Sequence, residues 1–210
     1  FYDTTHNTYF TFLLDYEPTI VCAGKETFSV CDGADFYIYS YSDKSGEAVY
    51  HIRFPNVVTD CAYSFGSFYL LTAEANGKHI IELAADGSYS DIQAASPSSG
   101  NSFSSITADF LGNIYLLSGK YVYRFTRDTF LQNGLPVASH VFPVSPNAIA
   151  SDYAGKLYGL TASAIYCSDG TSVTSADFSA LESIVYSQSQ RSILAFAIGF
   201  ESSYVYLLSD

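Results

Sequence analysis

The chain contains no Trp and no Met, and charged residues make up only 14% of its 210 positions. Basic residues are especially few, because nine Lys and Arg, scattered singly, stand against 21 Asp and Glu and give a net charge of −12. A chain of this charge repels a phosphate backbone unless it gathers a basic patch, and the sequence has no such patch. We therefore expect no nucleic-acid partner.

Long apolar runs are missing as well. The longest, residues 193–200, is far shorter than the roughly 20 residues that a membrane-spanning helix needs, so we expect no membrane insertion. Hydrophobic residues still make up 48% of the chain, with 19 Tyr and 16 Phe among them. Such a chain can bury a sizeable core, which predicts one compact domain over residues 1–210 and excludes disorder.

The four cysteines form no metal-binding pattern. The sequence has no Cys-x-x-Cys pair and no His within a few residues of a Cys, so we expect no metal and no cofactor. Each Cys has strand-like neighbours, which predicts mostly buried, reduced thiols and a fold that does not depend on disulfides. Cys22 and Cys31, nine residues apart across a predicted hairpin, are the pair that we expect to be the exception.

Localisation is inferred from composition. Few Lys and Arg, many Ser and Tyr and an acidic balance are typical of secreted or cell-surface proteins. The chain begins at Phe1 with no basic and apolar leader, so we expect a mature or excised segment. No Asn is followed two residues later by the Ser or Thr that N-glycosylation requires, which favours a prokaryotic source if the protein is secreted.

A repeat organises the chain. Three segments align without gaps, and each is typical of a strand, a tight turn with Gly and a second strand: Tyr63-Ser-Phe-Gly66-Ser-Phe-Tyr69, Asp109-Phe-Leu-Gly112-Asn-Ile-Tyr115 and Asp152-Tyr-Ala-Gly155-Lys-Leu-Tyr158. Weaker copies surround Tyr37 and Leu194. The copies are spaced roughly 40 residues apart, which is the length of a four-stranded propeller blade.

Turn signals between the copies complete this unit. Asp-Gly and Asn-Gly dipeptides, which favour tight hairpins, recur at residues 32, 76, 86, 133 and 169, and no segment has a convincing helical period. The sequence therefore predicts an all-β fold, a small β-propeller of about five four-stranded blades. The predicted blades are residues 19–56, 57–95, 101–143, 146–180, and 182–210 together with 1–15.

Closure of the ring is predicted from the chain ends. The last blade is one strand short, and the strand-like residues 8–14 have no place in the other blades. We expect residues 8–14 to pair with residues 204–208, which would remove the exposed strand edges. An incomplete propeller and a β-sandwich or other all-β fold are the alternatives.

The repeat resembles a known family. The segment Ile106-Thr-Ala-Asp109-Phe-Leu-Gly112-Asn-Ile-Tyr115, followed by Tyr121-Val-Tyr-Arg-Phe125, resembles the repeat of NHL and related β-propellers, in which an apolar strand ends in Asp-x-x-Gly-Asn, an apolar residue and Tyr. The segment from Ala148 to Tyr158 matches nearly as well. The resemblance implies the architecture and says little about function, because propellers serve as hydrolases, lyases, lectins and scaffolds.

Candidate site residues lie on one predicted rim. No nucleophile elbow, phosphate-binding Gly-rich loop, His-Glu-x-x-His or calcium loop is present, so we predict no catalytic residue. Equivalent turns of neighbouring blades lie side by side, which predicts a binding site from the residues at these turns: Tyr63, Phe65, Asp109, Phe110, Asp152 and Tyr153. In the structural alternative, each Asp accepts turn N–H groups and each ring fills space between blades.

Two functions are consistent with these features. The first is a non-enzymatic binding or interaction module, extracellular or at the cell surface, with a protein or glycan partner. The second is a carbohydrate-active hydrolase or lyase on a five-bladed propeller, for which Asp60, Asp109 and Asp152 are the candidate acids. We favour the first, because no recognisable glycosidase motif accompanies these acids.

Overall fold

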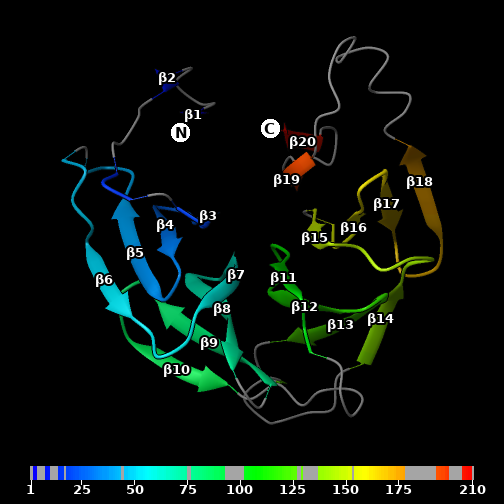
Figure 1. Ribbon diagram of the computed structural model, residues 1–210, viewed down its shortest axis with the longest axis horizontal. Coiled ribbons are helices and arrows are strands. Elements are labelled where there is room, and N and C mark those ends of the chain that lie inside the picture. The colour runs from blue at the N-terminus through cyan, green and yellow to red at the C-terminus, as the bar shows by residue number, and fades with distance from the viewer. Residues whose placement is uncertain are drawn as a thin grey trace.

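The chain forms a β-propeller of four-stranded antiparallel sheets. The structure is a computed structural model that describes residues 2–3, 8–9, 14–16, 18–43, 45–74, 77–92, 102–126, 129, 137–152, 154–177, 193–198 and 205–209. Within these ranges, four sheets of four strands follow one another around a common centre (Figure 1). Each sheet is a meander whose first strand lies nearest the centre and whose fourth lies at the periphery.

The strands run as follows. The first blade consists of β3 (Ile20–Ala23), β4 (Thr27–Asp32), β5 (Asp35–Ser40) and β6 (Tyr50–Arg53). The second consists of β7 (Val58–Ser64), β8 (Ser67–Glu74), β9 (Gly77–Ala84) and β10 (Tyr89–Ile92). The third consists of β11 (Ser105–Ala108), β12 (Asn113–Ser118), β13 (Tyr121–Thr126) and β14 (Val137–Val141). The fourth consists of β15 (Ala148–Ser151), β16 (Leu157–Leu160), β17 (Ala164–Ser168) and β18 (Val173–Asp177).

The expectation of about five four-stranded blades is wrong, because four blades of four strands are described. Beyond them, β19 (Ile193–Ile198) and β20 (Val205–Ser209) form a two-stranded sheet, and β19 contacts the inner strand β15. The repeat copy around Leu194, like the one around Tyr37, lacks Gly at the position where the three clear copies have it. The assignment of residues 1–210 to a single domain stays a prediction.

The predicted closing pair is also wrong for the strands that the structure describes. In the N-terminal segment, β1 (Tyr2–Asp3) pairs with β2 (Thr8–Tyr9), while β20 pairs with β19. Within the described residues, each of these short strands therefore pairs with its neighbour in the chain. Residues 10–13 and 204 lie outside the described residues. No helix in the described part of the chain is long and apolar enough to cross a membrane.

The core lies between neighbouring blades. Alternating side chains of β4 and β5 place Cys31, Phe36 and Ile38 against Phe68 and Leu70 of the second blade. The next two interfaces are built in the same way, with Leu71, Ile80, Ile106 and Leu116 between the second and third blades and Tyr115, Leu117, Ile149 and Leu157 between the third and fourth. These apolar layers hold each sheet against the next and thereby position the turns at the strand ends.

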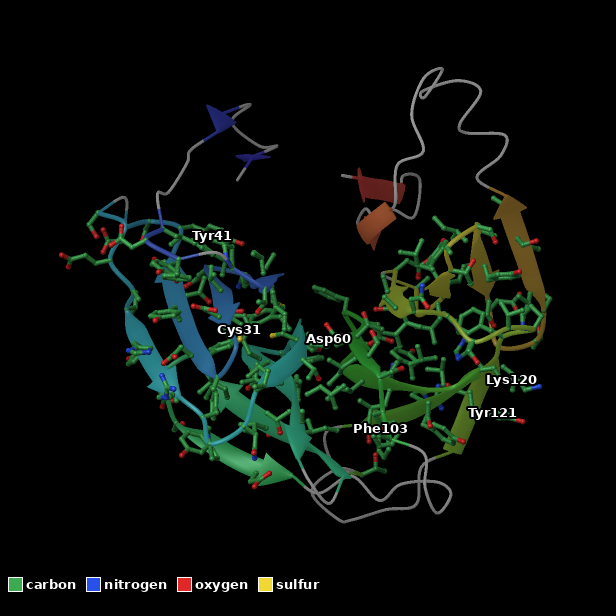
Figure 2. All side chains as sticks on the ribbon, in the orientation of Figure 1. Cys31, Tyr41, Asp60, Phe103, Lys120 and Tyr121 are labelled. Carbon is green, nitrogen blue, oxygen red and sulfur yellow. The ribbon has the colours of Figure 1, made fainter. Side chains whose placement is uncertain are left out.

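Polar side chains join the inner strands of successive blades. Ser105 Oγ and the Ile106 N–H both donate to Asp60 Oδ2, at 2.6 and 2.8 Å, and so connect β11 to β7 (Figure 2). Ser151 Oγ donates to the Ala108 carbonyl at 2.7 Å and connects β15 to β11. These bonds therefore fix how far each inner strand is shifted along its own direction relative to the next inner strand.

Candidate functional site

The turns that join the first and second strands of each blade form one edge of the propeller, which we call the hairpin rim. It comprises residues 24–26, 65–66, 109–112 and 152–156, with residue 153 outside the described residues. Neighbouring turns contact each other through their glycines. Gly24 lies against the Tyr63 ring, Gly112 against the Phe65 ring, and Gly155 against Tyr115 Oη and Asp109 Oδ2. The prediction that these turns become neighbours in space is confirmed by these contacts.

Phe65 occupies an unusual position in the hairpin rim. Ser64 and Ser67 pair directly, so Phe65 and Gly66 form a two-residue turn with φ of 49° and 85°. Two positive φ angles are the mark of a type I′ turn, whose first central position favours Asn, Asp or Gly. Among the described residues Phe65 is the one non-glycine with positive φ, and it is 71% exposed. The turn thus presents an aromatic ring to solvent from a strained backbone.

The next turn presents two further apolar side chains. Phe110 and Leu111 are 64% and 65% exposed, and they lie in the four-residue turn between β11 and β12. The Phe65 ring lies against Gly112 of this same turn. Phe65, Phe110 and Leu111 therefore belong to adjoining turns of two blades, and we call them the apolar patch.

The two rim aspartates hold these turns. Asp109 is buried; its Oδ1 accepts the N–H groups of Leu111 and Asn113 at 2.9 and 2.8 Å, and its Oδ2 accepts Tyr115 Oη at 2.9 Å. Asp152 is buried as well and accepts the N–H groups of residues 154 and 156. Their carboxylates are therefore directed into the protein, where they fix the shape of the turns.

The tyrosines beside these aspartates remain protonated at neutral pH. Burial, followed by the hydrogen bond to Asp109, raises the pKa of Tyr115 above its usual range. Burial, together with nearby Cys167 and Asp152, raises the pKa of Tyr158 to about 12. Each phenol can therefore serve as a donor to the carboxylate that holds its turn.

The remaining predicted rim residues differ in position. Tyr63 is half-buried, with its ring 5.0 Å from the ring of Phe68, and it packs against the core between the first and second blades. Tyr153 lies outside the described residues. Leu111 was not among the predicted site residues, although an apolar residue in the middle of a hairpin turn is a usable signal. A binding role for these rim residues stays a prediction.

The candidate acids of the enzymatic alternative are each engaged by backbone groups. Asp60 Oδ1 accepts the N–H of Cys61 at 2.9 Å, and its Oδ2 connects the second and third blades. Asp109 and Asp152 accept the N–H groups of their own turns. In the described ranges, no group of three or more His, Cys, Asp or Glu could hold a metal ion.

A groove of about 400 Å³ lies away from this rim, between the outer strands of the third and fourth blades. Its lining includes Lys120, Val141, Tyr166 and Val173. Lys120 follows the end of β12 that is opposite to the hairpin rim. Figure 2 shows Lys120 and Tyr121 at the outer side of the third blade. The Lys120 Nζ lies 5.6 Å from the centre of the Tyr121 ring.

No protein-family model matches this sequence, and neither does any curated protein. Solved structures are similar in fold. A streptogramin B lyase is 17% identical with a TM-score of 0.56 over 76% of this chain and 54% of its own. PorZ, a bacterial surface component of the type-IX secretion system of Porphyromonas gingivalis, is 11% identical with a TM-score of 0.59 over 90% of this chain and 23% of its own. YCF48 bound to D1 peptide is 8% identical with a TM-score of 0.58 over 95% of this chain and 68% of its own.

These likenesses concern architecture. The chain spans about half the length of the streptogramin B lyase and about a quarter of the length of PorZ. All three identities are well under a quarter, a level at which fold is shared without a shared function being implied. Together with the four radially arranged sheets, they show that the chain has the β-propeller fold, as its repeat resemblance implied.

Proposed function

We propose that the chain is a non-enzymatic binding module, secreted or at the cell surface, that recognises a protein or peptide partner through Phe65, Phe110 and Leu111. The observation that carries this proposal is Phe65, an exposed ring at a turn position where its backbone is strained. Asn or Gly would form the same turn more easily, so the turn itself does not require an aromatic side chain. Strained, exposed aromatic residues of this kind are typical of contact sites.

The chemistry of the apolar patch favours a peptide over a glycan. A sugar site needs hydroxyl-binding carboxylates beside its stacking rings, but those of Asp109 and Asp152 are occupied by turn N–H groups and buried. Leu111 adds aliphatic surface, which suits an apolar side chain of a partner. The solved complex of YCF48 with a peptide and the surface location of PorZ are in keeping with this proposal.

The test is selection of a displayed random-peptide library on the whole chain, followed by affinity measurement with synthetic peptides. The rim variant combines Phe65→Asn, which suits a type I′ turn, with Phe110→Ser. The control is Val57→Ser, because Val57 is 51% exposed and precedes the opposite end of β7. We expect the rim variant to bind the selected peptides at least ~10-fold more weakly and the control to bind them within about twofold of wild type.

Two outcomes would contradict the proposal. Peptides that bind wild type and rim variant equally would place their contact elsewhere on the molecule. Binding to a glycan array, or glycan cleavage that is lost in Asp109→Asn or Asp152→Asn, would favour the carbohydrate-active alternative. Thermal unfolding of the rim variant checks that it is folded under the conditions of the binding measurement.

A further inference from the structure

Two of the four thiols meet at the interface between the first and second blades. Cys22 lies on β3 and Cys61 on β7, and these two inner strands contact each other. Both side chains are half-buried and pack against the apolar cluster that contains Phe36 and Phe68. Cys22 and Cys61 therefore approach one apolar layer from two different blades.

Ser29 locates the two sulfur atoms relative to each other. Cys22 and Ser29 are directly paired in the antiparallel β3–β4 ladder, so their side chains lie next to each other on one face of the sheet. The Ser29 Oγ is 3.9 Å from the Cys61 Sγ of the second blade. The Cys61 thiol thus reaches the part of the first blade where Cys22 lies. Burial, followed by the neighbouring Cys22 thiol, raises the pKa of Cys61.

The other two cysteines are placed differently. Cys31 is fully buried, its Sγ donates to the Gly33 carbonyl at 3.3 Å, and burial raises its pKa to about 11. Its direct strand partner is Ile20, so the hairpin does not pair Cys22 with Cys31 as the sequence suggested. Cys167 lies on β17 of the fourth blade, opposite Tyr158. All four thiols are free in the structure, and the prediction that most of them are buried is wrong, because only Cys31 is buried.

We propose that Cys22 and Cys61 form a reversible disulfide that joins the first blade to the second under oxidising conditions. With oxidised glutathione as the oxidant, the Cys22 thiolate attacks one glutathione sulfur, forms a mixed disulfide and releases one glutathione thiolate. The Cys61 thiolate then attacks the Cys22 sulfur and releases the second. The two cysteines lose two protons and two electrons, and the glutathione disulfide becomes two thiols.

This bond would connect strands that are distant in the chain and already adjacent in space. It would close a loop from residue 22 to residue 61, which contains most of the first blade, and so restrict the unfolded chain. Because β3 and β7 already contact each other, and the Cys61 thiol lies beside Ser29, the strand partner of Cys22, the bond would need little rearrangement of the inner strands. The bond would therefore act as a redox-dependent staple on a fold that is complete without it.

The experiment uses the whole chain, fully reduced and then equilibrated in glutathione buffers of increasing oxidising strength. Proteolysis without reduction, followed by mass spectrometry, should identify one linked peptide pair containing Cys22 and Cys61. Oxidation should raise Tm by roughly 5–10 °C, and dithiothreitol should reverse the increase. Since only thiolates react, the bond should form faster at pH 9 than at pH 7.

Matched variants identify the pair. Cys22→Ser should abolish both the linked peptides and the increase in Tm, whereas Cys167→Ser should retain both. Absence of the Cys22–Cys61 peptide pair from wild type at the most oxidising buffer would overturn the proposal, and so would a dominant link that involves Cys31 or Cys167. Because the peptide map is made on wild type, this result does not depend on whether a variant folds.

Discussion

The ring of Phe65 rests on the backbone of Gly112 in the next blade, where a Cβ added to Gly112 would lie 2.6 Å from the ring atom Cε2. Gly112 also has a φ of 83°, which side chains other than Gly rarely adopt. The position of an exposed aromatic residue in one blade therefore depends on the missing side chain of a residue in another.

Gly112→Ala should lower stability and displace the Phe65 ring. We expect a loss of about 2–3 kcal/mol, since backbone strain and the contact with the ring act together. Gly66→Ala is the matched control, because Gly66 has a φ of 85° and nothing within 4 Å of an added Cβ, so strain alone should cost about 1 kcal/mol. Urea unfolding measures both. Equal losses would show that the ring simply moves aside.

Asp60→Ala should weaken the contact between the second and third blades and lower the stability of the protein. The substitution removes the acceptor for Ser105 Oγ and leaves the Ile106 N–H without this partner, which we expect to cost about 2–4 kcal/mol. Combining Asp60→Ala with Ser105→Ala in a double-mutant cycle should give a coupling energy of about 1–2 kcal/mol. Additive losses in urea unfolding would mean that the two side chains stabilise the fold independently.

Ser118→Ala should be neutral or stabilising. Ser118 is 2% exposed, and its Oγ is the buried side-chain polar atom without a hydrogen-bond partner within the described residues. Replacing an unsatisfied hydroxyl with hydrogen removes a desolvation penalty, so we expect the free energy of unfolding to stay the same or to rise by up to about 1.5 kcal/mol. Calorimetric unfolding measures this change. In the same measurement Ser105→Ala, which removes a hydrogen-bonded hydroxyl, should lower the stability of the protein. A loss of stability in Ser118→Ala would indicate a bound water molecule.

His140 should make stability depend on pH. Burial, followed by the charge of Arg124, lowers the pKa of this imidazole below 6.5, so the folded chain binds fewer protons than the unfolded chain in mildly acidic solution. Its stabilising contribution is therefore complete above pH 6.5 and is lost as the pH falls, by at most ~1.4 kcal/mol per pH unit. Denaturant unfolding should be measured from pH 5 to 8. The free energy of unfolding should depend less steeply on pH in His140→Gln than in wild type.

The repeated Asp-x-x-Gly turn made much of this fold predictable. Asp109 and Asp152 lie in hairpin turns of successive blades, and the Gly residues after them have positive φ, because the local sequence determines a tight hairpin. The local sequence does not determine which role a turn residue has. The same Asp can face a ligand or its own turn, and only the folded structure shows that Asp109 and Asp152 accept N–H groups of their own turns.

Individual contacts between blades could not be predicted from the sequence. Asp60 and Ser105 are 45 residues apart, and the strand that carries Asp60 has an irregular register between Val58 and Asp60 that its sequence does not signal. The strained φ of Phe65 is likewise visible only in the folded turn, since Phe is a poor residue for that position. Where a fifth blade was predicted, the described residues form only the two-stranded sheet of β19 and β20.

The bonds from Ser105 and Ser151 to the preceding inner strands bear on how the molecule opens. An apolar layer tolerates sliding of one sheet over another. The hydrogen bonds of Ser105 to the Asp60 carboxylate, at 2.6 Å, and of Ser151 to the Ala108 carbonyl, at 2.7 Å, are instead lost after a displacement of one residue. Opening of one blade must therefore break bonds that belong to its neighbours. Amides of β7, β11 and β15 should accordingly exchange with solvent together, in one cooperative event, rather than blade by blade.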